Sequence, residues 1–193
     1  MSEKPFTVLV VCTGNIVRSP LAEQLLTATL HGLPALAREV VISSAGTEAP
    51  VGAPMAPQAE ALSVREGGNP EGHEARQLTA DLIREADLVL AATRGHRSAV
   101  AKLVPRSART LFTIREFGRL ADAIMKMEPD VAASADDLRE LVAIAAATRG
   151  YLSPVEPDDD NIIDPIGRSD RTYARMAKEL VPAVRSASAL LFR

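Results

Sequence analysis

The chain has 193 residues, of which 47% are hydrophobic, and its 22 basic and 25 acidic side chains give a formal net charge of −3. This length is typical of one domain whose core is large enough to fold without a metal or a disulfide. The near balance of charge argues against a general nucleic-acid-binding or anionic-membrane surface, and the apolar content excludes global disorder. We therefore expect neither nucleic acid nor membrane among the partners.

Cys12 is the only cysteine in the sequence, which also contains three histidines. A single cysteine excludes an internal disulfide and argues against a Cys/His zinc site, so no metal is expected. The first residues lack the long apolar stretch of a secretory signal, and no stretch approaches the roughly 18 apolar residues of a membrane-spanning helix. A lone thiol favours a reducing compartment, and we expect a cytoplasmic protein.

Short apolar runs alternate with helix-like stretches along the chain. The predicted strands are 7–11, 40–43, 86–91 and 108–112. A first helix is predicted from Ser19, whose hydroxyl would cap it ahead of Pro20. The other predicted helices are 57–65, 79–85, 96–103, 135–148 and 170–192. This alternation is typical of βαβ units. It predicts an α/β fold with a parallel sheet. We expect a single doubly wound domain over residues 1–193, with a four-stranded parallel sheet in the order 2-1-3-4 and flanking helices.

The segment at about 127–157 interrupts this alternation. It contains an alanine-rich helical stretch between two proline-containing stretches. We interpret it as a helical insertion between the fourth strand and the last helix, not as a separate domain. The three aspartates at 158–160, just after it, could bind a cation, but a solvated acidic loop is the favoured interpretation.

The most informative stretch is 12–20, which reads Cys-Thr-Gly-Asn-Ile-Val-Arg-Ser-Pro. Its cysteine lies at the carboxyl end of the first predicted strand, where ligands bind in open α/β sheets. A short loop that enters a helix N-terminus directs backbone N–H groups at an anion. Gly14 permits a positive φ there, and Arg18 can bind two oxygens of a tetrahedral dianion. Such a loop would hold a phosphate above a thiolate, with the Ser19 hydroxyl hydrogen-bonded to the sulfur.

A lone cysteine at a strand end is more often a small buried hydrophobic residue. Here the cysteine is followed by five residues and then Arg-Ser-Pro, with Gly-Asn inside the interval. This spacing favours the phosphate loop. Neither the Walker pattern nor the Gly-x-Gly-x-x-Gly pattern of other phosphate-binding loops is present.

The stretch resembles the signature of the low-molecular-weight protein tyrosine phosphatases, Cys-x-Gly-Asn-x-x-Arg-Ser-Pro. Residues 43–47 (Ser-Ser-Ala-Gly-Thr), residues 73–78 (His-Glu-Ala-Arg-Gln-Leu) and the late Asp164-Pro165 also look like this family. The resemblance covers roughly residues 6–118 and 160–193, leaves the insertion outside, and favours a bacterial member. It implies hydrolysis of phosphate monoesters, chiefly protein phosphotyrosine, without a cofactor. The implied partner is a phosphorylated protein, such as a tyrosine kinase or its target.

The resemblance also implies roles for individual residues. Cys12 would be the nucleophile that forms a cysteinyl-phosphate, Arg18 would bind the phosphoryl oxygens, and Asp164 would act as general acid and then base. The implied phosphate-binding loop consists of Thr13, Gly14, Asn15, Ile16, Val17, Arg18 and Ser19. The residues implied to support this loop from behind are Asn15, Ser19, Ser44 and His73. Asp-Pro is also a common turn dipeptide, and His73 could equally be a histidine satisfied within its own loop.

Several positions depart from the family pattern. Val17 stands where many relatives have a second cysteine, and Ile166 stands after Asp-Pro where the family usually has an aromatic residue. Tyr151, in the insertion, is a candidate for the missing aromatic wall. Ile16 stands where phosphoarginine-directed relatives carry threonine, which favours an aryl ester over a guanidino ester.

Two other functions remain open. A thiol-dependent arsenate reductase shares this type of loop, because arsenate mimics phosphate. A non-catalytic module could bind phosphate or phosphoproteins through an intact loop. The presence of Asp164 argues for the phosphatase over both.

Overall fold

The computed structural model describes residues 4–127 and 134–192. Residues 128–133, which belong to the expected insertion, lie outside the described part. Within that part, four parallel strands form one sheet in the order β2-β1-β3-β4, which confirms the predicted order. The strands are β1 (Phe6–Cys12), β2 (Val40–Gly46), β3 (Leu88–Ala91) and β4 (Leu111–Thr113).

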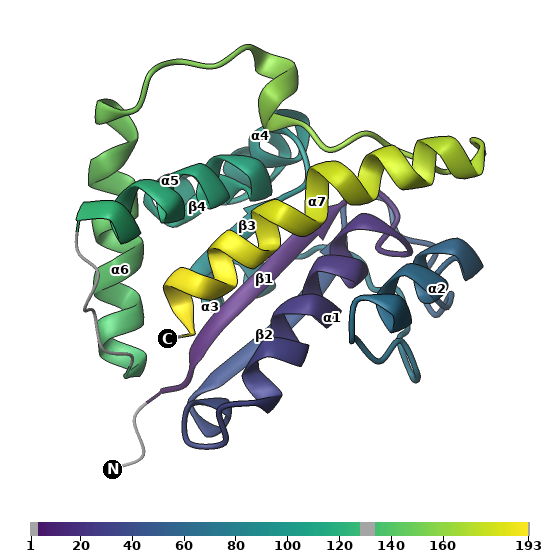
Figure 1. Ribbon diagram of the computed structural model, residues 1–193, viewed down its shortest axis with the longest axis horizontal. Coiled ribbons are helices and arrows are strands. Elements are labelled where there is room, and N and C mark those ends of the chain that lie inside the picture. The colour runs from purple at the N-terminus through teal and green to yellow at the C-terminus, as the bar shows by residue number, and fades with distance from the viewer. Residues whose placement is uncertain (1–3, 128–133, 193) are drawn as a thin grey trace.

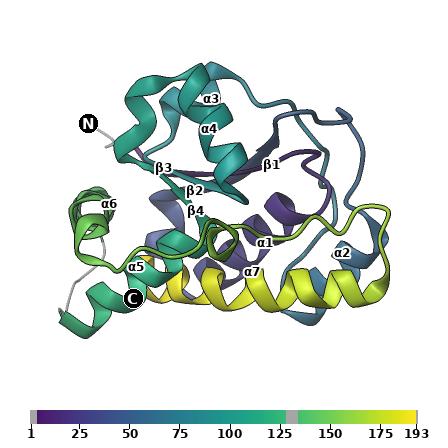
Figure 2. The ribbon, with the colours of Figure 1, turned by 90° about the horizontal axis from the view of Figure 1, so that it is seen from above.

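Helices cover both faces of the sheet (Figures 1 and 2). On one face lie α3 (Ala80–Glu85) and α4 (Arg94–Leu103), and on the other lie α1 (Arg18–His31), α5 (Ile114–Met127) and α7 (Asp170–Leu191), with α2 (Pro57–Arg65) beside α1. Side chains of β1 alternate between the two faces. Val8 and Val10 belong to the larger core with α1, α5 and α7, whereas Leu9 and Val11 belong to the smaller core with α3 and α4. No helix in the described ranges is long and apolar enough to span a membrane.

The helix α5 was not predicted, although its apolar residues follow a helical period. The buried apolar positions are Ile114, Phe117, Leu120, Ala121 and Ile124. The helix packs along α7, and Gly118 allows the close approach, because a Cβ there would lie 2.9 Å from Ala183 Cα. This pair of helices forms much of the larger core.

The fourth strand begins later than predicted, at Leu111 instead of residue 108. Pro105 starts a short 3₁₀ helix, η2 (Pro105–Arg109), and the Thr110 N–H then closes a turn onto Ser107 O at 2.9 Å. Proline is favoured at the first position of such a turn because its φ is already helical. The backbone therefore becomes extended only after Thr110. The third strand also starts late, at Leu88 instead of residue 86.

The helix α6 (Ala135–Thr148) has the predicted bounds and is followed by the short 3₁₀ helix η3 (Arg149–Tyr151). It lies along the edge where the strands begin, at the opposite end of the sheet from the β1–α1 loop (Figure 1). The hydrogen bonds of α6 and η3 follow the strand order of the sheet. They run from Ala135 to Glu39 before β2, from Arg139 to Lys4 before β1 and to Asp87 before β3, and from Arg149 to Leu111 in β4.

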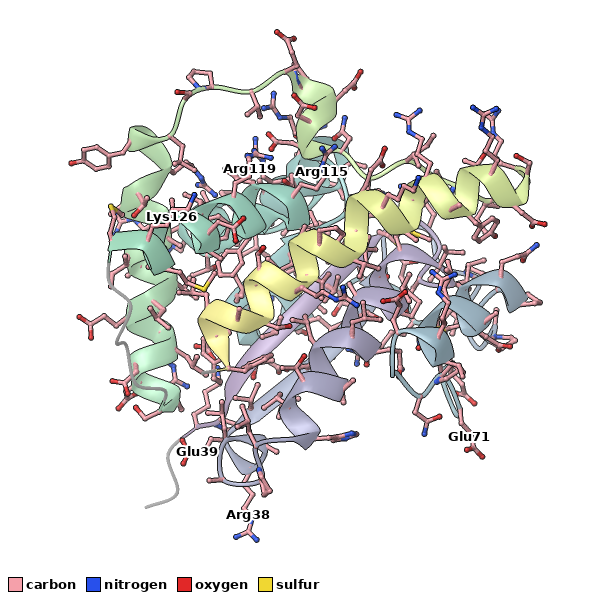
Figure 3. All side chains as sticks on the ribbon, in the orientation of Figure 1. Arg38, Glu39, Glu71, Arg115, Arg119 and Lys126 are labelled. Atoms are coloured by element: carbon pink, nitrogen blue, oxygen red, sulfur yellow. The ribbon has the colours of Figure 1, made fainter. Side chains whose placement is uncertain are left out.

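The acidic stretch after α6 contains a buried aspartate, so the expectation of a solvated loop is wrong for Asp160. This residue lies in the 3₁₀ helix η4 (Pro157–Asp160), is 3% exposed and pairs with Arg94 at 2.5 Å and with Arg119. Arg115 donates to Asn161 O at 3.0 Å, and Figure 3 shows Arg115 and Arg119 on α5 beside this segment. Burial alone would raise the pKa of Asp160, but the hydrogen bonds from Arg119 and Arg94 outweigh it and lower this pKa. The segment that leads to Asp164 is thus fixed to α4 and α5.

Candidate active site

Cys12 lies at the carboxyl end of β1 and is 2% exposed. Ser19 Oγ lies 3.0 Å from Cys12 Sγ, and the Asn15 N–H donates to the same sulfur over 3.3 Å. Because Ser19 Oγ also accepts a hydrogen bond from Asn15 Nδ2 at 3.0 Å, its own proton is available to the sulfur. Two donors directed at one sulfur stabilise negative charge there.

The prediction that Ser19 caps α1 is wrong. The helix begins at Arg18, and Val17 precedes it without a capping side chain. The Ser19 hydroxyl is instead engaged with the side chains of Cys12 and Asn15. The Ser19 hydroxyl therefore forms hydrogen bonds within the loop and with the sulfur, and does not cap the backbone of the helix.

The loop between β1 and α1 offers backbone donors to an anion. Within the described part of the chain, no hydrogen-bond partner is found for the N–H groups of Gly14, Ile16 and Val17. The first turn of α1 follows immediately, and a helix N-terminus carries a partial positive charge. N–H groups of this kind bind the oxygens of a phosphate.

Asn15 carries the left-handed turn of the loop. Its φ is 54°, whereas Gly14, where a positive φ was expected, does not adopt one. Asparagine tolerates this conformation, and side-chain hydrogen bonds hold it: Nδ2 donates to Ser44 Oγ at 2.6 Å and Oδ1 accepts from the Arg76 N–H at 2.9 Å. His73 Nε2 lies 2.7 Å from Asn15 O. The structure thus brings Asn15, Ser44 and His73 together behind the loop.

Two residues behind the loop had not been singled out. Glu23, on α1, accepts a hydrogen bond from Ser44 Oγ at 2.5 Å. Burial raises the pKa of Glu23, although the hydrogen bond from Ser44 and the charges of His73 and Arg76 oppose the rise. Gly46 ends β2 against the loop, and a Cβ there would lie 3.0 Å from Asn15 N. Its place in the block 43–47 was a signal that could have identified this close approach.

Arg18 and Asp164 form an ion pair, with 2.6 Å between Nη2 and Oδ2. The Arg18 side chain is 5% exposed and that of Asp164 is 48% exposed. Arg18 Nη1 also donates to Ile162 O at 3.3 Å, and Asp164 Oδ1 accepts from the Ile166 N–H at 3.2 Å. The Ile162 N–H donates to Ala92 O at the end of β3, so the segment with Asp164 lies at the same sheet edge as Cys12.

His96 contacts the loop, although no sequence pattern indicated it. Its Nε2 lies 2.9 Å from Thr13 Oγ1, and its Nδ1 lies 2.8 Å from Thr93 Oγ1. Burial lowers the pKa of His96 to about 4, and the charge of Arg18 acts in the same direction while that of Asp164 opposes it. The imidazole is therefore neutral at neutral pH.

A pocket of about 140 Å³ lies among these groups. It is lined by Cys12, Thr13, Gly14, Ile16, Val17, Arg18, Asp164 and Ile166. Its apolar wall is aliphatic, and Ile166, at the position where an aromatic residue was expected, is 46% exposed. An apolar group that entered the pocket would lie against isoleucine side chains.

Tyr151 does not supply the missing aromatic wall. It is 88% exposed and ends η3, which follows directly on α6. The helix α6 lies at the edge of the sheet where the strands begin (Figure 1). Neighbouring Arg149 donates to Leu111 O at the start of β4. The hypothesis was wrong because the insertion runs along the opposite edge of the sheet from Cys12.

The arrangement suits the transfer of a group from a tetrahedral dianion. The guanidinium of Arg18 and the loop N–H groups can bind its oxygens. The sulfur of Cys12 can attack its central atom from the base of the loop. The half-exposed carboxylate of Asp164 can exchange a proton with the leaving group. Among the described residues, no group of three or more His, Cys, Asp or Glu side chains is placed to hold a metal ion.

One protein family and several known proteins are similar in sequence to this chain. A sequence model of the family described as low molecular weight phosphotyrosine protein phosphatase matches residues 7–156. The match runs through the insertion, which the sequence resemblance had left outside, and it ends before Asp164. The low molecular weight protein-tyrosine-phosphatase Etp of Escherichia coli (strain K12) is 39% identical over 99 residues, which are 51% of this chain and 62% of Etp. The aligned region thus spans less than two thirds of that curated relative.

Solved structures share the fold over nearly the whole chain. The crystal structure of the Erwinia amylovora tyrosine phosphatase AmsI has a TM-score of 0.66 at 25% identity, covering 97% of this chain and 93% of AmsI. The YwlE arginine phosphatase from Geobacillus stearothermophilus has a TM-score of 0.65 at 25% identity, covering 95% of this chain and 91% of YwlE. The same fold thus occurs in proteins named for two different phosphorylated residues.

Proposed function

Because the chain belongs to the low molecular weight phosphotyrosine protein phosphatase family, we propose that it hydrolyses phosphate monoesters, chiefly protein phosphotyrosine, through a cysteinyl-phosphate. The observation that carries this proposal is the convergence of a sulfur, a guanidinium and a carboxylate on one pocket of about 140 Å³. These groups belong to Cys12, Arg18 and Asp164.

In the first step the Cys12 thiolate attacks phosphorus. The S–P bond forms, the ester P–O bond breaks, and Asp164 donates its proton to the leaving oxygen. Arg18 and the N–H groups of the loop bind the three non-bridging oxygens, which carry the negative charge of the transition state. The hydrogen bonds from Ser19 and the Asn15 N–H stabilise negative charge on the sulfur as it attacks and leaves.

In the second step a water molecule attacks the phosphorus of the cysteinyl-phosphate. Asp164 accepts a proton from this water, the S–P bond breaks, and inorganic phosphate leaves with the thiolate regenerated. The same carboxylate therefore acts as acid and then as base. Its partial exposure supports this role, since both the leaving group and the water must reach it.

The proposed substrate is an aryl phosphate ester. The pocket wall is aliphatic, with Ile16 and Ile166 among its residues, so a phenol ring would pack on isoleucine side chains. Ile16 also lacks the hydroxyl that a threonine would offer to a guanidino group. The proposed partner is a phosphorylated protein, such as a tyrosine kinase or its target. The proposed compartment is the reducing cytoplasm, because the nucleophile acts only as a free thiolate.

We also propose that residues 1–193 form one domain in which about 127–157 is a helical insertion. The hydrogen bonds of α6 with the chain at the start of the sheet support this organisation.

The test is the release of phenolate from an aryl phosphate at mildly acidic pH by the reduced wild-type protein and by Cys12→Ser. We expect turnover by the wild type and none by the variant, with circular dichroism showing that both are folded. Phosphoarginine serves as the comparison substrate and should be hydrolysed more slowly. Absence of turnover by folded wild type would contradict the proposal. Arsenate-dependent oxidation of an added thiol would then indicate the reductase, and phosphate binding without turnover the binding module.

A further inference from the structure

We propose that His96 is a positioning residue for Arg18 and acts through the hydroxyl of Thr13. This inference rests on the proposed phosphatase function and adds to it a residue outside the phosphate-binding loop. It assigns the imidazole no contact with the substrate. Its effect is to hold the guanidinium over the pocket.

The geometry links the three side chains in a row. Arg18 Nη2 donates to Thr13 Oγ1 at 3.3 Å, and the same hydroxyl lies 2.9 Å from His96 Nε2. The other ring nitrogen of His96 lies 2.8 Å from the hydroxyl of Thr93, which caps α4 by accepting the His96 N–H at 3.2 Å. The ring is therefore held at both nitrogens, by a hydroxyl that follows β1 and one that follows β3.

The direction of each hydrogen bond follows from the donors available. A guanidinium has only protons to give, so the Thr13 oxygen accepts from Arg18 and its own proton points to His96 Nε2. Nε2 must then be the unprotonated nitrogen, and Nδ1 carries the proton that is donated to Thr93. Among the described residues, the charges that act on the pKa of the ring are those of Arg18 and Asp164, and the lowering of this pKa by burial agrees with a neutral imidazole.

This chain of hydrogen bonds matters because Asp164 cannot remain the partner of Arg18 during the reaction. The carboxylate must turn to the leaving oxygen, and the guanidinium must bind the phosphoryl group. The acceptors that then remain for Arg18 are Thr13 Oγ1 and Ile162 O, each at 3.3 Å. Without His96 the Thr13 hydroxyl loses the acceptor that fixes its proton, so the hydroxyl can rotate and its oxygen is no longer held in place as an acceptor for Arg18.

The experiment is a double-mutant cycle on aryl phosphate hydrolysis with His96→Ala, Thr13→Val and the double variant. Each single variant should lower kcat/KM and weaken inhibition by inorganic phosphate by about tenfold, the value of a hydrogen bond to a charged group. The double variant should be no worse than the more damaging single variant, since both remove the same link. His96→Gln, whose amide oxygen can accept from Thr13, should recover most of the loss. His31→Ala, at the exposed end of α1, should match the wild type.

Imidazole titration by NMR gives a second readout that does not depend on turnover. In the wild type the His96 ring should titrate with a midpoint of about 4, and in Thr13→Val the midpoint should rise, because the neutral ring loses its hydrogen-bond donor. The three histidines of the chain make assignment by substitution simple.

The outcomes separate this inference from the proposed function. If wild-type protein turns over substrate but the two single effects multiply in the double variant, or His96→Gln is as poor as His96→Ala, the positioning role is wrong while the phosphatase function stands. If the His96 midpoint is unchanged in Thr13→Val, the positioning role is also wrong. If folded wild type shows no turnover, the proposed function fails, and the phosphatase role assigned to His96 fails with it.

Discussion

Asp164 and Arg18 hold each other through an ion pair of 2.6 Å, although the proposed reaction needs each of them on a different oxygen of the same phosphate ester. Binding of a dianion must therefore compete with the carboxylate for the guanidinium. The pair also brings residues from the two ends of the chain to one point above Cys12. It thus couples the binding of the phosphoryl group to the position of the proton donor.

Asp164→Asn removes the proton donor and at the same time frees Arg18 from its ion pair, so it separates proton transfer from anion binding. We expect kcat for an aryl phosphate to fall by about 10²–10⁴-fold, as for loss of a general acid. Affinity for vanadate or inorganic phosphate, measured by calorimetry, should rise because Arg18 is freed and a negative charge is removed. Asp170→Asn, an exposed acid in the first turn of α7, is the matched control and should change neither quantity. Weaker anion binding by Asp164→Asn would show that the ion pair does not compete with the ligand.

Ser19→Ala tests the hydroxyl that lies beside the sulfur. The variant loses a hydrogen bond to a negatively charged atom, so we expect kcat/KM to fall by about tenfold to a hundredfold. Alkylation of Cys12 by iodoacetamide at neutral pH should slow as well, because a hydrogen bond that stabilises negative charge on the sulfur is lost. Ser43→Ala, whose hydroxyl donates to a backbone carbonyl in β1, is the control and should react like the wild type. Equal alkylation rates in Ser19→Ala and wild type would rule out a role for Ser19 in stabilising the thiolate.

Ile166→Phe tests the aliphatic wall of the pocket. An aromatic side chain at this half-exposed position can stack on a phenol ring, so KM for an aryl phosphate should fall about two- to tenfold with little change in kcat. KM for an alkyl phosphate should not change. Val64→Phe, an exposed position on α2, provides the control for a general effect of added apolar surface. An equal fall in KM for both substrates would argue against stacking.

Asp160→Asn tests the ion pairs that fix the segment before Asp164. We expect the free energy of unfolding at neutral pH to fall by about 2–3 kcal/mol, from the loss of two charge-assisted hydrogen bonds. Asp159→Asn, whose side chain is 59% exposed and lies 3.9 Å from Arg115, should cost under about 0.5 kcal/mol. Urea titrations of both variants measure the difference.

The stabilisation of the fold by the Asp160 ion pairs should depend on pH in one definite direction. The pKa of Asp160 is lowered by its arginine partners, so its pairing stabilises the fold above the ordinary aspartate pKa of 3.8 and is lost as pH falls through the lower, folded value. The difference between wild type and Asp160→Asn should therefore be full at neutral pH and shrink only below about pH 4. A difference that vanishes between pH 5 and 7 would contradict this assignment.

The parts of the fold that were predicted depend on local patterns. The alternation of apolar runs and helices indicates a parallel α/β sheet, and the stretch 12–20 contains the sulfur, the guanidinium and the loop in one uninterrupted motif. The helix α6 was predicted to the residue because alanines and a polar first turn define it. The helix α5 was not predicted, although its buried apolar residues recur at helical spacing in the sequence.

Three features that the sequence did not indicate involve contacts between distant parts of the chain. His96 reaches Thr13 only because β1 and β3 are neighbours, and 83 residues separate the two in sequence. Asp160 became a buried anion because arginines from α4 and α5 surround it, which its acidic neighbours in sequence did not suggest. Tyr151 was misplaced because nothing local fixes the edge of the sheet on which the insertion lies. The spacing of residues within 12–20 is enough to indicate a phosphate-binding loop. The residues that contact His96 and Asp160 come from distant parts of the chain and are set by how the elements pack.

Trapping the proposed cysteinyl-phosphate tests directly whether Cys12 is the nucleophile. Wild-type protein mixed with excess aryl phosphate and denatured within milliseconds should gain the mass of one phosphoryl group, and fragmentation should locate it on Cys12, the only cysteine of the chain. Asp164→Ala, which lacks the base for the second step, should retain the phosphoryl group longer. Phosphoryl transfer to another residue, or full-rate turnover by Cys12→Ser, would contradict the central claim that this sulfur is the nucleophile.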